Sequence, residues 1–191
     1  TFSQGYSIPN DNPWLSPEGD FLEEFYAIGL RSPYAMSYDD AAQLIWMADV
    51  GIYSREEISR VEKGDNLQWP YREGSKVSSD HRRPDPFLGR ERAPYFEYDR
   101  AFGGCIIGGG VYRSDRFPAL QHQYLFADYT INRVYTVSAA TDATEPAFRT
   151  LLTDLESQPV AVPPKPGITG VFPLSDGQVL LTVMGDYENP E

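Results

Sequence analysis

The chain alternates short apolar runs with turn-forming residues along most of its length, a pattern that predicts β-strands. The run at 43–50, QLIWMADV, is almost entirely apolar, as an inner strand of a sheet is, and PYAMSYD at 33–39 alternates between two faces. No stretch sustains a strong helical period, although a short helix is an alternative at 56–62. We therefore predict eleven strands, at residues 21–28, 33–39, 43–50, 56–62, 94–99, 105–113, 123–129, 132–139, 147–153, 168–174 and 178–184.

Two polar stretches interrupt the strand pattern. Residues 71–92 are rich in Arg, Asp, Ser and Pro, and residues 154–167 are polar and rich in Pro. Both are longer than the usual connections of a compact domain. We predict that they are surface-loop insertions in a single domain spanning residues 1–191.

Composition supports an all-β fold without choosing among its architectures. The chain is 41% hydrophobic and 23% charged, an ordinary balance for a globular protein, and it is 14% aromatic, with 16 Gly and 16 Pro. Many short strands separated by turns occur in sandwiches, barrels and the blades of propellers. The strand pattern alone leaves these three architectures open.

The charge balance excludes some partners. The net charge is −12, and the densest basic run, His81-Arg82-Arg83, is followed by Pro84 and Asp85. Without a basic stripe, nucleic acid and anionic membrane surfaces are poor partners. No apolar run approaches the roughly 18 residues that span a bilayer, so we expect no membrane insertion.

Four longer motifs carry a resemblance to a known family. Their order and spacing are similar to the glucose/sorbosone dehydrogenase family over about residues 8–184. That family forms six-bladed β-propellers, and eleven strands at four per blade make about three blades. The resemblance therefore implies an all-β partial propeller with few or no helices, similar to the C-terminal half of the family's domain. The longer motifs are IGLRSPYAMSYD (28–39), IWMADVGIYSREEISRVEKGDNLQWP (45–70), GGGVYRSDRFPALQHQYLFADYTINRVYTV (108–137) and ITGVFPLSDGQVLLT (168–182). A fifth, shorter motif, IPNDNP (8–13), resembles a turn that recurs upstream of them in the family.

The resemblance implies two classes of function. Enzymes of the family oxidise aldoses with pyrroloquinoline quinone held by calcium, which would make a sugar the ligand and the periplasm or the exterior the location. Missing N-terminal blades, or a second copy in a homodimer, would complete the ring. Relatives such as the propeller of Hedgehog-interacting protein bind a partner instead. The alternative is therefore a non-catalytic propeller that binds a protein or a glycan through loops 71–92 and 154–167.

The resemblance also assigns the candidate site residues. Arg31 stands where the family has an arginine that faces the quinone, and Ser32 follows where the family usually has Asn. A planar guanidinium suits carboxylates and quinone oxygens. Gly51 and Ile52 stand where backbone carbonyls ligate calcium, a hard cation that prefers oxygen. A structural arginine and an ordinary turn after a strand remain the alternatives.

No catalytic residue is assigned. Oxidation of a sugar hydroxyl needs a general base, a role that suits histidine. The chain has two histidines, His81 and His122, and neither matches the position of the family's base.

Three further features are interpreted as architecture. Glu56 and Glu57 are adjacent, so on a strand they point to opposite faces and form no close carboxylate dyad. We expect one to form a salt bridge or cap a loop and the other to be solvated. Asp128 and Arg113 lie in strand motifs and are expected to form a buried pair. Trp69 is expected to close a blade, with stacking on a sugar as the alternative.

Overall fold

The chain folds almost entirely into β-strands. The computed structural model describes residues 5–14, 23–140, 148–152 and 167–185. Within them the one helical element is a three-residue 3₁₀ turn, Pro118–Leu120. The strands are β1 Pro33–Asp39, β2 Leu44–Asp49, β3 Arg55–Val61, β4 Asp65–Asn66, β5 Arg72–Glu73, β6 Lys76–Val77, β7 Arg90–Glu91, β8 Phe96–Asp99, β9 Ile106–Tyr112, β10 Gln123–Asp128, β11 Arg133–Ser138, β12 Phe148–Leu152, β13 Gly167–Pro173 and β14 Val179–Met184.

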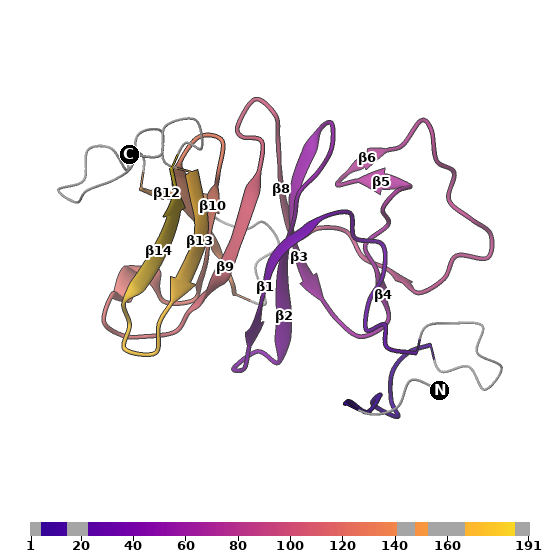
Figure 1. The fold of residues 1–191 in the computed structure, drawn as a ribbon, viewed down its shortest axis with the longest axis horizontal. Coiled ribbons are helices and arrows are strands. Elements are labelled where there is room, and N and C mark those ends of the chain that lie inside the picture. Colours follow the sequence, from indigo (N-terminus) through magenta and orange to yellow (C-terminus); the bar gives the residue numbers. More distant parts are fainter. Residues whose placement is uncertain (1–4, 15–22, 141–147, 153–166, 186–191) are drawn as a thin grey trace.

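Three antiparallel sheets stand side by side (Figure 1). The first sheet has the order β1-β2-β3-β8, the second has β9-β10-β11-β12, and the third is the β13–β14 hairpin. Strand β9 contacts both β1 and β13, so the first strands of the three sheets are neighbours. This is the arrangement of propeller blades, and it confirms the predicted partial propeller of about three blades.

The predicted hairpin between the last two strands is present. Ser175-Asp176-Gly177 forms the turn, with Gly177 at a φ of 82°. The N–H of Leu174 donates to the carbonyl of Gln178 at 2.8 Å, which closes the turn. A positive φ is the conformation that glycine adopts without steric cost, so the Asp-Gly signal predicted this reversal correctly.

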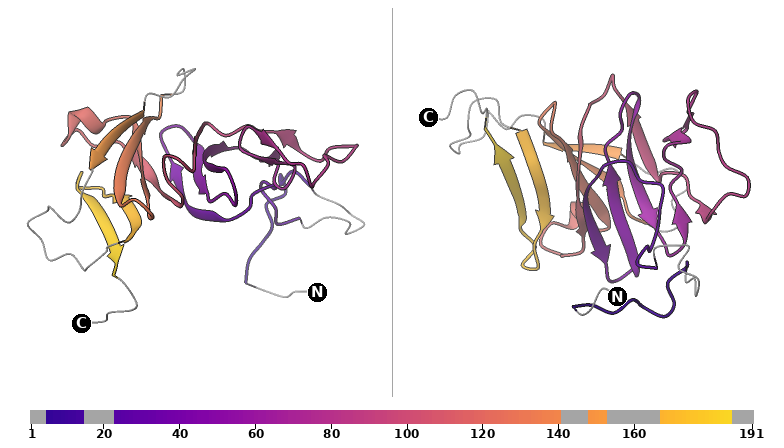
Figure 2. Two further views of the ribbon diagram at one scale, coloured as in Figure 1. Left: turned by 90° about the horizontal axis from the view of Figure 1, so that it is seen from above. Right: turned by 45° about the vertical axis from the view of Figure 1, so that its right-hand side comes forward.

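The long connection between β3 and β8 carries small structural elements of its own. The parallel pair β4–β7 and the antiparallel pair β5–β6 lie in it, on the side of the first sheet away from the second (Figure 2). The polar stretch 71–92 therefore holds three of the two-residue strands. The other polar stretch, 154–167, lies outside the described residues except for Gly167.

An aromatic core joins the first and second sheets. Trp46 of β2 stacks on Tyr124 of β10, with ring centroids 4.7 Å apart, and both side chains are fully buried. Phe126 and Tyr135 stack beside them at 5.4 Å. Full burial of such side chains contributes on the order of 2–3 kcal/mol each, and an aromatic pair adds about 1 kcal/mol. Aromatic side chains thus form a large part of the contact between the first two sheets.

Glycine lets strand β9 approach both of its neighbours. A Cβ atom on Gly109 would overlap the carbonyl oxygen of Leu125 and lie 2.7 Å from that of Val171. The Gly108-Gly109-Gly110 run therefore permits the second sheet to pack closely between the first and the third.

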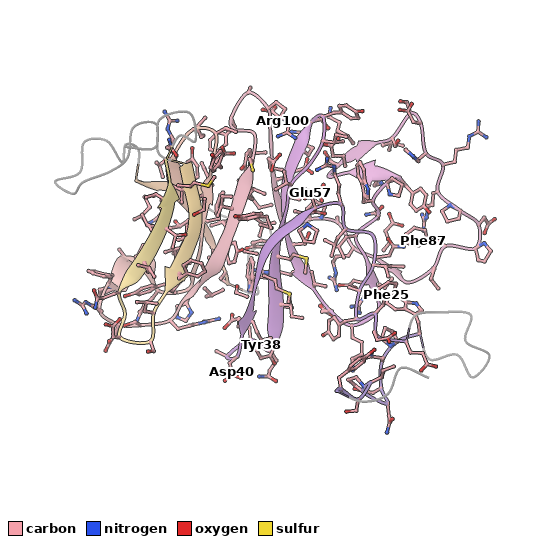
Figure 3. The ribbon with its side chains drawn as sticks, viewed as in Figure 1. Phe25, Tyr38, Asp40, Glu57, Phe87 and Arg100 are labelled. Atoms are coloured by element: carbon pink, nitrogen blue, oxygen red, sulfur yellow. The ribbon has the colours of Figure 1, made fainter. Side chains whose placement is uncertain are left out.

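Ten of the predicted strands are present, with bounds within two residues of the prediction, and one prediction is wrong. Residues 23–28 of the predicted strand 21–28 form a single bridge, Ile28 with Asn66. The backbone of Ile28 bonds to Asp65 and Leu67, each at 2.9 Å, rather than to a sheet edge. Phe25, labelled in Figure 3, is 46% exposed. Within the described ranges, no helix is long and apolar enough to cross a membrane.

Candidate functional site

Arg31, Ser32 and Gly51 meet where β1 begins and β2 ends. The guanidinium Nη1 of Arg31 donates to the carbonyl oxygens of Val50, at 2.8 Å, and Gly51, at 3.2 Å. The backbone N–H of Arg31 and that of Ser32 donate to the Asp49 carboxylate at 2.8 and 2.6 Å. Asp49 is the last residue of β2, so strand pairing places its carboxylate beside the start of β1.

The guanidinium of Arg31 is held in place and still has free donors. It lies over the ring of Trp69, 5.7 Å from the centroid. Arg31 has five N–H donors. Among the described residues, Nε and Nη2 have no hydrogen-bond partner, so these atoms remain available to an oxygen-rich ligand. Burial raises the pKa of Asp49 even though the two N–H donors oppose the shift.

The turn that contains Gly51 and Ile52 is wrapped around a carboxylate from the long loop. The Oε1 atom of Glu73 accepts four consecutive backbone N–H groups. Burial would raise the pKa of Glu73, but these donors outweigh it and hold the pKa below its usual value. The donors are Ile52 at 2.8 Å, Tyr53 at 2.8 Å, Ser54 at 2.9 Å and Arg55 at 3.1 Å.

Sequence reasoning missed Glu73. It stands in a polar stretch 21 residues after Ile52, and nothing in the local pattern predicts that an anion will return to the turn. The one sequence signal for such an acceptor was the turn after β2, because adjacent backbone N–H groups that do not pair within a sheet need an acceptor.

Glu57 is a buried carboxyl group whose pKa lies well above its usual value. Burial raises its pKa to about 8, the neighbouring Asp49 carboxylate adds to the shift, and the Gly74 N–H at 2.5 Å opposes it. Glu97 and Glu73 add smaller repulsions. Figure 3 labels Glu57 on β3, at the end of the first sheet that carries the Arg31 site.

The prediction that one residue of the Glu56-Glu57 pair is solvated is wrong, because both are buried. Glu56 forms the expected salt bridge, with Arg100, and accepts the Ile106 N–H at 2.8 Å. It therefore ties the first sheet to the second. The two carboxylates do point to opposite faces, so the absence of a dyad is confirmed.

The predicted pair of Arg113 and Asp128 does not form. Strand register explains why: Asp128 pairs with Ile106 at one end of β9, whereas Arg113 follows the other end. The partners of Asp128 are the Tyr98 hydroxyl at 2.7 Å and backbone N–H groups that include Gly104 at 2.8 Å. Arg113 instead bonds to Asp39 and to His122.

The two histidines lie at different places. His122 contacts Arg113 at 2.7 Å, near the end of β9 that is far from Arg31. His81 lines a cavity of about 300 Å³ together with Ile52 and Trp69, although its ring is exposed. The structure thus places His81 near the predicted site, a proximity that the sequence did not indicate.

The described residues fit an anionic quinone better than they fit calcium. The free Nε and Nη2 donors of Arg31 match the carboxylates and oxygens of such a cofactor. Calcium takes six to eight oxygen ligands. Here the carbonyl of Gly51 already accepts the Arg31 cation, and the described residues contain no group of three or more His, Cys, Asp or Glu that suits a metal. These residues do not by themselves complete a calcium site.

Comparison with known proteins gives consistent results. The model of the glucose/sorbosone dehydrogenase family matches residues 2–160. The HIPL1 protein of Arabidopsis thaliana is 29% identical over 182 residues, which are 87% of this chain and 26% of that protein. The chain therefore spans about a quarter of that curated relative.

Solved structures show the fold. The apo-form of the soluble aldose sugar dehydrogenase from Escherichia coli superposes with a TM-score of 0.68 at 21% identity, covering 92% of this chain and 48% of that one. The PQQ-bound form of aldose sugar dehydrogenase from Streptomyces coelicolor superposes with a TM-score of 0.57 at 17% identity, covering 87% and 39%.

Proposed function

The chain belongs to the glucose/sorbosone dehydrogenase family, and from that premise we propose that it forms the later, cofactor-facing blades of a quinone-dependent aldose dehydrogenase and is not catalytic alone. The observation that carries the proposal is the fixed guanidinium of Arg31 with its unused donors. The aldose dehydrogenase of Streptomyces coelicolor, which shares the fold, was solved in its PQQ-bound form.

Each residue of the site has a defined task in this proposal. Asp49 fixes the backbone of Arg31 and Ser32 through two hydrogen bonds. The carbonyls of Val50 and Gly51 orient the guanidinium, which leaves Nε and Nη2 to donate to a carboxylate or quinone oxygen. When bound, the quinone supplies an acceptor for the two electrons that leave the aldose.

In this proposal, two parts that turnover needs lie outside the described residues. Among the described residues, no histidine contacts the Arg31 cluster, so the base would come from elsewhere. Strand β1 also leaves apolar side chains open, with Tyr34 44%, Met36 70% and Tyr38 58% exposed. Further blades, from the same polypeptide or from a second copy, would cover them and complete the ring. By kinship we place the complete protein in the periplasm or outside the cell.

A binding and turnover experiment tests this proposal. The chain is titrated with pyrroloquinoline quinone, and the loaded chain is then offered aldoses with an artificial electron-accepting dye. We expect saturable binding of the quinone and no dye reduction. Absence of binding contradicts the cofactor-facing role, and sustained dye reduction by the monomeric chain contradicts the need for further blades.

A further inference from the structure

Positive charge is concentrated in one segment of this acidic chain. Residues 71–92 contain six Lys and Arg against four Asp and Glu, whereas the rest of the chain contains ten against twenty-four. Arg90 and Arg92 are neutralised by Asp65 and Glu62, each of which pairs with both arginines. Lys76 and Arg82 form neither an ion pair nor a side-chain hydrogen bond with any described residue. Arg72 donates to the carbonyl oxygen of Ser75 and forms no ion pair with a described residue. The segment therefore presents three cations, Arg72, Lys76 and Arg82, without an anionic partner among the described residues.

These cations lie in two adjoining cavities. One measures about 300 Å³ and is lined by Tyr53, Trp69 and Lys76 among others. The second measures about 280 Å³ and is lined by Arg82 and Phe87 among others. Both have Arg72, Val77, Ser78 and His81 in their walls, so the two cavities are neighbours across these residues. The pair is called the loop groove below, and each cavity is one of its lobes.

Aromatic side chains stand beside the cations in both lobes. Tyr53 is 77% exposed in the first lobe, where Trp69 is half-buried. In the second lobe Tyr71 meets Phe87 edge to face, at 6.4 Å, and Arg83 lies over Phe87 at 4.0 Å. Figure 3 labels Phe87 in the outer loop. Such faces offer apolar contact to the C–H face of a sugar ring, and exposed cations attract anionic groups.

The acidic groups at the loop groove are already engaged. Glu73 Oε1 is saturated by four backbone donors. Asp80 accepts the Ser79 hydroxyl at 2.8 Å, and Glu91 pairs with Arg83 at 2.9 Å. The walls of the two lobes hold four cations, Arg72, Lys76, Arg82 and Arg83, against three carboxylates, Glu73, Asp80 and Glu91. The groove therefore carries a small positive excess, which separates it from the acidic surface elsewhere on the chain.

We propose that the loop groove binds an anionic saccharide of at least two units. Its rings lie against Tyr53, Trp69 and Phe87, and its carboxylate or sulfate groups contact Lys76 and Arg82. Each lobe is near the lower limit of about 300 Å³ for small-ligand sites, which suits one sugar unit. Lys76 and Arg82 do not contact Arg31, whereas Trp69 lies under the Arg31 guanidinium and also lines the first lobe, so the two sites adjoin at this ring.

Calorimetric titration of the chain tests the proposal. The probes are a uronate oligosaccharide, a sulfated oligosaccharide and a neutral oligosaccharide of the same length. We expect one or both anionic probes to bind, the neutral one to bind at least tenfold more weakly, and the affinity to fall as salt rises. The preferred anionic probe tells which group, carboxylate or sulfate, is recognised.

Matched variants locate the binding. Lys76→Ala and Arg82→Ala should each weaken it about tenfold, and Tyr53→Ala should weaken it as well. Arg116→Ala removes an equal charge at the opposite end of the sheets and should leave the affinity unchanged. Equal affinity for the neutral probe, equal loss in Arg116→Ala, or tighter binding of a phosphopeptide or an oligonucleotide would overturn the proposal. Loss of quinone binding alone would leave it standing.

Discussion

The Nη1 atom of Arg31 lies 3.2 Å from the carbonyl oxygen of Gly51 and donates a hydrogen bond to it. This bond links the start of β1 to the turn after β2, and the bond to Val50 at 2.8 Å runs beside it. Asp49 closes the same link through the backbone of Arg31. The orientation of the guanidinium therefore depends on the shape of the turn, and the shape of the turn depends on Glu73.

Substitution of Gly51 by Ala should damage this turn. An added Cβ would overlap the carbonyl oxygen of Arg55 and lie 2.5 Å from Glu73 Oε1. Since both are fixed by hydrogen bonds, we expect a loss of about 2–4 kcal/mol in the free energy of unfolding. Chemical denaturation measures this loss. Gly5→Ala is the control, because nothing lies within 4 Å of its added Cβ. Equal stability of the two variants would show that the turn is not rigid.

The stability of the chain should fall as pH rises from about 5 to 8. The carboxyl of Glu57 has its pKa raised from 4.5 to about 8 by burial and by Asp49. In this pH range the folded state keeps a proton on Glu57 that the unfolded state releases. The contribution of Glu57 to the free energy of unfolding is therefore fully present below the pKa of the unfolded state, and it is lost as pH rises through the pKa of the folded state. The raised pKa of Asp49 acts in the same direction. Unfolding free energies at a series of pH values should therefore decrease by roughly 3–5 kcal/mol at most.

The variant Glu57→Gln should remove most of that pH dependence. Glutamine is neutral throughout and keeps an oxygen for the Gly74 N–H. Glu91→Gln is the matched control, since that carboxylate is exposed in an ion pair with Arg83, and it should retain the slope. A wild-type slope in Glu57→Gln would mean that another group titrates.

Removing Glu56 should loosen the first sheet from the second. Its carboxylate is fully buried, pairs with Arg100 and accepts the Ile106 N–H. Glu56→Ala leaves the arginine and the amide without their acceptor, so we expect a loss of about 3–5 kcal/mol in unfolding free energy. Denaturation followed by tryptophan fluorescence reports it, because Trp46 lies in the core between the two sheets. A loss below about 1 kcal/mol would contradict this role.

Most of the fold follows from local pattern. Period-two alternation and apolar runs predict the strands, and the Asp176-Gly177 turn predicts the last hairpin. The failure at 21–28 has a physical cause. Alternation of apolar and polar residues shows which side chains a strand would bury, but it does not show whether a neighbouring strand is available for pairing. The backbone of Ile28 bonds to Asp65 and Leu67 and not to the edge of a sheet.

The candidate site was only partly predictable. The family motifs assigned Arg31 and Gly51 to the same site. The hydrogen bond between them follows from the pairing of β1 with β2. The role of Glu73 and the raised pKa of Glu57 depend on contacts across the long loop and on burial beside Asp49. Neither property is encoded in a window of neighbouring residues. The same holds for Asp128, whose partner is Tyr98 rather than Arg113.

The most direct measurement of the central claim is the dissociation constant of pyrroloquinoline quinone for the chain and two variants. Quenching of Trp69 fluorescence should report it, because the ring contacts the guanidinium of Arg31. We predict saturable binding to the wild type, binding at least tenfold weaker in Arg31→Ala, and unchanged binding in Arg116→Ala. Equal affinities in all three proteins, or no binding up to about 1 mM, would contradict the claim.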